Sequence, residues 1–136
     1  MTKNRLVRLV GITLVSVWII GCDGAGKNAP AVVKVKGTVT LDGNPMPDGE
    51  VMFSIPSSGT APSVMNVVNG AFSGEAKVGE NRVEVYAYKD GPPSTTDPMT
   101  PTKVNFIPDR YGSQSTLTAA VTKDGPNEFK FEVKSK

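Results

Sequence analysis

Residues 33–41 read VKVKGTVTL, a stretch in which apolar and polar side chains alternate with a period of two. Successive side chains of a β-strand point to opposite faces of the sheet, so one face of this segment is apolar and the other is polar. The apolar face carries Val33, Val35, Val39 and Leu41, and the opposite face carries Lys34, Lys36, Thr38 and Thr40. The pattern predicts a strand with one face in a core and the other in water.

The same alternation recurs along the rest of the chain. Six further segments share it, at residues 51–55, 65–67, 71–72, 83–88, 116–122 and 129–134. Asn69-Gly70 is a strong signal for a two-residue hairpin turn between two of them. No apolar stripe at helical spacing outlasts the prolines. Seven short strands with frequent turns predict an all-β fold, an antiparallel seven-stranded β-sandwich of the immunoglobulin-like kind.

Four Asp-Gly pairs, which begin at residues 42, 48, 90 and 124, follow or separate the expected strands. Because glycine readily adopts positive φ, we expect the chain to turn at all four. Residues 90–110 contain five prolines. Proline cannot donate to a strand ladder, so we expect an irregular loop there. A loop of this length is the first candidate for part of a binding surface.

The composition limits the chemistry that the chain can carry. Its 136 residues suffice for one domain with a single hydrophobic core. The single cysteine excludes an intrachain disulfide, and histidine is absent. The commonest general base and metal ligand is therefore missing. We expect a protein that is not an enzyme and that binds no cofactor or metal.

The N-terminus has a different pattern. Residues 1–8, MTKNRLVR, contain three basic residues, and residues 9–20, LVGITLVSVWII, contain no charge. A basic segment followed by an apolar one and a small residue is typical of a secretory signal peptide. The apolar run of about 12 residues is shorter than the roughly 20 that a transmembrane helix needs. We therefore expect residues 1–21 to be a helical signal peptide.

Ile19-Ile20-Gly21-Cys22, at the end of this run, resembles a lipobox, the processing signal of bacterial lipoproteins. The resemblance implies that the thiol of Cys22 takes a diacylglycerol and that the chain is cut between Gly21 and Cys22. Two or more acyl chains would then hold the protein on a bacterial membrane, at its periplasmic or cell-surface face. An ordinary signal peptide and an uncleaved anchor are the alternatives.

Residues 22–31 are small and polar, and we expect a flexible tether before a sandwich domain of residues 32–136. Cleavage would remove Lys3, Arg5 and Arg8, and the remaining 12 Lys and Arg face 13 Asp and Glu. Binding to nucleic acid needs clustered, uncompensated basic residues. We therefore expect no nucleic-acid partner.

Three segments together resemble the carboxypeptidase regulatory-like domain family. Residues 35–45, VKGTVTLDGNP, are similar to its opening pattern V-x-G-x-V-x-x-D-G-x-P, and Val51–Phe53 with Pro56 is similar to its second strand. Parts of residues 107–131 resemble the C-terminal half of small bacterial lipoproteins that carry this domain. The resemblance implies a transthyretin-like sandwich with a non-catalytic role. Asn69 departs from the acidic residue that is frequent at its position in the family.

Candidate site residues can be named from the expected faces. Tyr86, Tyr88 and Tyr111 form a candidate binding surface, because aromatic side chains away from the core can bind glycans. Their alternative role is packing between strands. Aspartates of the turns could bind calcium, and Glu75, Glu80 or Glu84 could supply an acid/base pair, but neither group has a supporting motif.

The sequence thus predicts a non-enzymatic lipoprotein that is tethered to the membrane through Cys22. Its sandwich would have a structural or protein-interaction role at the cell envelope, with an envelope protein as the partner. The alternative is a carbohydrate-binding module at the cell surface, with a glycan as the partner.

Overall fold

The computed structural model describes residues 29–136. The predicted signal peptide and its helix, the cleavage site at Gly21 and Cys22, and most of the predicted tether lie outside the described residues. No helix within residues 29–136 is long and apolar enough to cross a membrane.

Ten strands and one short 3-10 helix, η1 (Asp109–Tyr111), make up the described part of the chain. The strands are β1 (Val32–Leu41), β2 (Asn44–Pro45), β3 (Asp48–Ser54), β4 (Ser63–Val68), β5 (Ala71–Lys77), β6 (Gly79–Tyr86), β7 (Tyr88–Pro93), β8 (Pro101–Asn105), β9 (Leu117–Val121) and β10 (Glu128–Val133).

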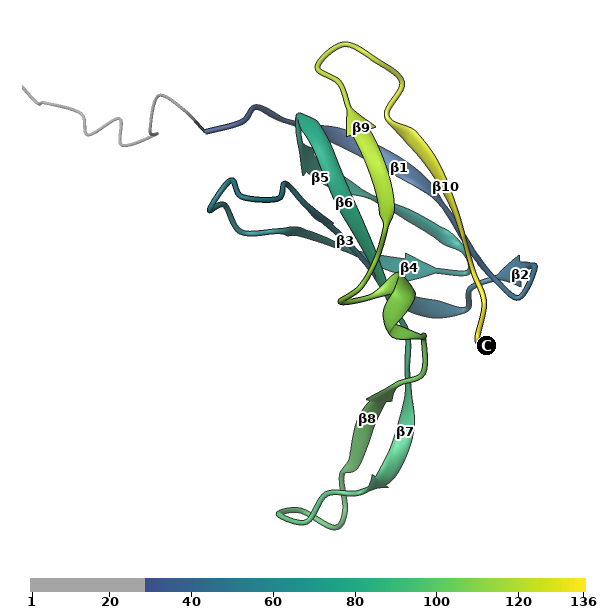
Figure 1. Cartoon of the computed structure of the whole chain (residues 1–136). Coiled ribbons are helices and arrows are strands. Elements are labelled where there is room, and N and C mark those ends of the chain that lie inside the picture. Colours follow the sequence, from purple (N-terminus) through teal and green to yellow (C-terminus); the bar gives the residue numbers. More distant parts are fainter. Residues whose placement is uncertain (1–28) are drawn as a thin grey trace, which may run out of the picture.

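Seven strands follow one another across the main sheet in the order β10-β1-β5-β4-β3-β6-β9, and β2 pairs with the end of β1. The sheet curls so that β6 and β9 lie across from β1 and β10 (Figure 1). The predicted all-β sandwich with seven main strands is confirmed. One ladder departs from the antiparallel pattern, because β1 and β10 run parallel.

The predicted core faces agree with the burial of the strands. Each of the seven main strands contributes buried apolar residues: Val35, Val39, Val51, Phe53, Met65, Val67, Phe72, Val83, Val85, Ala119, Val121, Phe131 and Val133. Phe53 of β3 lies at the centre of this core and is 1% exposed. Its ring centroid lies 6.0 Å from that of Phe72, 5.8 Å from Phe129 and 6.1 Å from Phe131. These rings come from β5 and β10, so Phe53 joins the two layers.

Two of the predicted turns have the backbone of a two-residue hairpin. Asn69 and Gly70 have φ of 50° and 81°, and Asp42 and Gly43 have φ of 51° and 85°. Positive φ at both central residues matches the twist of paired strands. The β4–β5 and β1–β2 turns are therefore correctly predicted.

Two other Asp-Gly predictions were wrong. Asp48-Gly49 lies at the start of β3, and Asp90-Gly91 lies within β7. Gly49 is paired with Val67 and is buried between the side chain of Met46 and the backbone of Tyr86. Pairing with neighbouring strands has overridden the local turn preference there.

The prediction of an irregular loop over residues 90–110 was also wrong in part. Strands β7 and β8 form a separate two-stranded hairpin, with Tyr88 opposite Asn105 and Asp90 opposite Lys103. The register shifts before Pro93 pairs with Pro101. A strand in a two-stranded ribbon has one free edge, so a proline can stand there without removing a ladder bond.

Replacing Phe53 with alanine tests the central role of its ring. We expect Phe53→Ala to lower the free energy of unfolding by about 3–5 kcal/mol, because the ring leaves a cavity between two layers. Met99→Ala, at a side chain that is 91% exposed, is the control and should change stability by no more than about 0.5 kcal/mol. Urea unfolding of the full chain measures both; equal effects would contradict the assignment.

Candidate binding surfaces

The three tyrosines of the predicted surface lie near the end of β6, but they do not form one platform. Tyr86, the last residue of β6, is half-buried, and Tyr88, at the start of β7, is 44% exposed. Tyr111 ends η1 and packs against the core. The guanidinium of Arg110 lies 5.0 Å from the centroid of the Tyr111 ring. Among these three rings, Tyr88 is therefore the one that is open to solvent.

A buried carboxylate occupies the outer face of β6. Arg82, Glu84 and Tyr86 share this face because they are spaced by two along the strand. The Tyr86 hydroxyl donates to Glu84 Oε2 at 2.6 Å, and the guanidinium of Arg82 donates to Oε1. The Glu84 side chain is only 8% exposed. Two donors, one of them charged, satisfy a group that would otherwise be costly to bury.

The connection from η1 to β9 closes over this cluster. The Ser115 hydroxyl donates to the carbonyl of Val83 on β6, and it accepts from the Leu117 backbone at 3.2 Å. A Cβ on Gly112 would lie 2.9 Å from the Tyr86 ring, so only glycine lets the chain approach this closely. The hydrogen bond to Glu84, followed by burial, raises the pKa of Tyr86 from 10.0 to about 12. Tyr86, whose hydroxyl is held by Glu84, thus packs against the segment that follows η1, and we call this contact the brace.

The three candidate glutamates do not share one site. Glu75 lies on β5, whereas Glu80 and Glu84 lie on β6 in the opposite layer. Glu80 lines a shallow hollow beside Arg82 and Thr118. The two carboxylate oxygens of Glu84 accept hydrogen bonds from Arg82 and Tyr86. The turn aspartates are also dispersed: Asp42 accepts from Ser135, and Asp90 pairs with Lys103. Within residues 29–136, no three carboxylates or other ligand side chains gather as a metal site.

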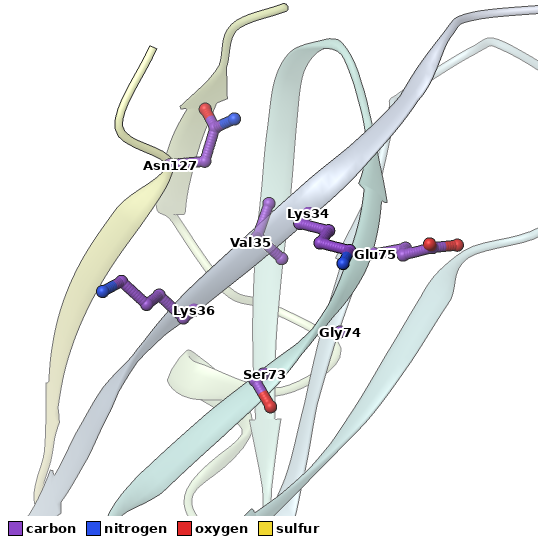
Figure 2. A pocket seen from close by; sticks show the side chains of 7 residues that line it. All are labelled: Lys34, Val35, Lys36, Ser73, Gly74, Glu75 and Asn127. Atoms are coloured by element: carbon purple, nitrogen blue, oxygen red, sulfur yellow. The ribbon is translucent and has the colours of Figure 1, made fainter. Parts of the chain in front are cut away.

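A groove crosses the outer face of the other layer, along β5. Figure 2 shows one end of it, where Lys34 and Lys36 of β1 lie beside Ser73 and Glu75 of β5. An adjoining hollow extends across β5 to Val64 and Val68 of β4 and shares four lining residues with the first, Lys36, Ser73, Gly74 and Glu75. The two hollows have volumes of about 550 and 740 Å³.

The groove exists because β5 presents small side chains on its outer face. Ala71 and Ser73 lie between the long lysines of β1 and the exposed valines of β4, which are 49% and 59% exposed. Sequence reasoning missed this surface, since it ended the strand at Phe72 and read the lysines of β1 as a solvated face. The signal was present in residues 71–77, AFSGEAK, where small and polar residues alternate with Phe72, Gly74 and Ala76.

Comparisons of the chain with protein-family models, with curated proteins and with solved structures give no match. The surfaces that the structure itself provides are the braced outer face of β6, the β7–β8 hairpin beside Tyr88, and the groove along β5.

The brace can be tested through its tyrosine. A raised folded-state pKa means that the contribution of Tyr86 to stability is complete below pH 10.0 and is lost as pH rises through about 12. We expect phenolate absorbance of the wild type to show a late step near pH 12 that Tyr86→Phe abolishes. Tyr88→Phe, the matched control, should keep the late step. A late step that persists in Tyr86→Phe would contradict the assignment.

Proposed function

We propose that this chain is a non-enzymatic, membrane-tethered lipoprotein whose carboxypeptidase regulatory-like sandwich contacts a partner protein at the bacterial cell envelope. The lipobox resemblance around Cys22 supports the tether. The β7–β8 hairpin projects away from the sandwich (Figure 1), and this position supports the proposal that the hairpin contacts the partner.

The hairpin leaves the sandwich far from the point where the chain enters it. The carbonyl of Ala31, just before β1, accepts from the backbone of Val78, the residue between β5 and β6. The hairpin begins at Tyr88, just beyond the other end of β6. Eight residues of strand separate these points, which corresponds to roughly 25 Å at about 3.3 Å per residue. A chain held at its N-terminal side therefore directs the hairpin away from the anchor.

The tip of the hairpin is ordered yet exposes an apolar side chain. Asp97 accepts from the Met99 backbone at 3.0 Å and from the Thr100 hydroxyl at 2.7 Å. The bond from Thr100, followed by that from Met99, lowers the pKa of Asp97, so this ordering holds above pH 3.8 and fails as pH falls through the lowered pKa. Met99 is 91% exposed at the tip. An ordered loop with an exposed methionine suits contact with a protein surface.

The tether is tested by removing its thiol. We expect Cys22→Ser to abolish incorporation of labelled fatty acid and to move the protein from the detergent phase to the aqueous phase in phase separation. Asp23→Ser keeps the thiol and is the matched control, which should partition as the wild type does. Acyl label on the Cys22→Ser variant would refute lipidation at this residue.

The contact is tested by placing a photo-crosslinking amino acid at position 99 in living cells. We expect discrete protein adducts from position 99 and none from position 120, which is exposed on β9 and pairs with Glu80 near the other end of β6 from the hairpin. Asp97→Ala should lower the yield several-fold because the tip loses its order. Equal adducts from both positions would contradict a contact at the hairpin. Glycan binding that Tyr88→Ala abolishes would favour the carbohydrate-binding alternative, because Tyr88 is the exposed ring.

A further inference from the structure

Strands β4 and β5 begin as a regular hairpin and then part. They share only two residue pairs, Val67 with Phe72 and Val68 with Ala71. Each strand continues on its other side, β4 with β3 over six pairs and β5 with β1 over seven. The main sheet is therefore split between β4 and β5 beyond the hairpin, and two stretches of strand edge border the split.

The direction of the backbone groups along β5 follows from hydrogen bonds at its two ends. The Val39 backbone donates to Gly70, and the Val78 backbone donates to Ala31. Backbone groups alternate in direction along an antiparallel strand, so even-numbered residues of β5 face β1. The N–H and C=O groups of Glu75, and the N–H of Lys77, consequently face the split.

These groups have few partners within the protein. The carbonyl of Lys77 accepts from the Asn81 side chain at 2.9 Å, and within residues 29–136 the β4–β5 ladder does not reach Glu75. Across the split, the Asn69 backbone donates to Pro47 beyond the end of the β3 ladder, so odd-numbered residues of β4 direct their backbone groups toward β3. The backbone groups of Val64, an even-numbered residue, therefore point into the split. Unpaired strand edges of this kind accept a further strand.

The split is closed on its core side by one adaptable side chain. Met65 of β4 lies over Gly74 of β5, where a Cβ would come within 2.6 Å of the Met65 side chain. Methionine is unbranched and changes conformation easily. On the outer side the groove of about 740 Å³ leaves the split open, with Val64 and Val68 along one wall. Met65 can thus move aside while the apolar wall stays in place.

We propose that the split between β4 and β5 binds an extended peptide, which adds as a strand to the free edge of β5 at Glu75 and Lys77. The occupant is a peptide because a row of N–H and C=O groups is matched by another polypeptide backbone. The charges of Lys77 and Glu75 determine which side chains of the peptide are favoured. An antiparallel peptide places an acidic residue opposite Lys77 and, two residues later, a basic residue opposite Glu75, with one small apolar residue between them that faces the core.

This inference extends the proposed interaction role to a second surface. Its test involves neither Cys22 nor the hairpin, so that either proposal can fail alone. The probe is the synthetic peptide Ser-Val-Glu-Val-Lys-Val-Ser, which is added to the full chain in detergent micelles. Binding is measured by fluorescence anisotropy of the labelled peptide and by amide hydrogen exchange of the protein.

In the free protein we expect the Glu75 and Lys77 amides to exchange at least ten-fold faster than those of Gly74 and Ala76. Saturating peptide should slow the exchange of Glu75 and Lys77 at least ten-fold. Unchanged exchange at both residues, or protection confined to the outer edges of β9 or β10, would overturn the proposal. This measurement requires no variant and so does not depend on the folding of one.

Glu75→Pro removes the donor that faces the split and leaves the ladder to β1 intact, since the Glu75 amide does not face β1. We expect it to weaken peptide binding at least ten-fold. Glu75→Ala, the matched control, keeps the N–H and loses only the charge, so it should weaken binding by no more than about five-fold. Wild-type affinity in a folded Glu75→Pro variant, checked by circular dichroism, would refute strand addition.

Discussion

Phe53 on β3 packs among Phe72 on β5 and Phe129 and Phe131 on β10, and this contact holds together two halves of one continuous sheet. A sheet of seven strands with one apolar face must cover that face, and here it does so by curling onto itself. The curl brings the first and last strands of the path, β10 and β9, to opposite layers. The two outer faces remain for surface contacts, and the β7–β8 hairpin projects away from both.

The two outer faces differ because connecting segments cover only one of them. On β6 the chain that follows η1 packs against Tyr86, and Tyr86 and Arg82 both donate to the buried Glu84. On β5 no segment within residues 29–136 closes over Ser73 and Glu75, and a groove persists there. The same alternation of side chains thus produces a rigid brace in one layer and an open surface in the other.

Local patterns predicted the strands well, since alternation reports which face of a strand is apolar. Val35 and Val39 are buried as their spacing requires, and Asn69-Gly70 forms the expected turn. The failures occurred where a neighbour strand decided the outcome. Gly49 was expected in a turn but pairs with Val67, and the proline-rich segment 90–110 was expected to be irregular but contains a ladder. Propensity describes one segment at a time, whereas pairing depends on two.

The sequence by itself determined the all-β class, the core face of each main strand and the lipobox-like segment at Cys22, because each is written in consecutive residues. The tertiary structure decided which polar residues are buried and which are exposed to water. Glu84 and Glu75 look alike in the sequence, yet one is bound by Tyr86 and the other borders the split between β4 and β5. That difference arises from contacts between segments far apart in the chain, which no local pattern encodes.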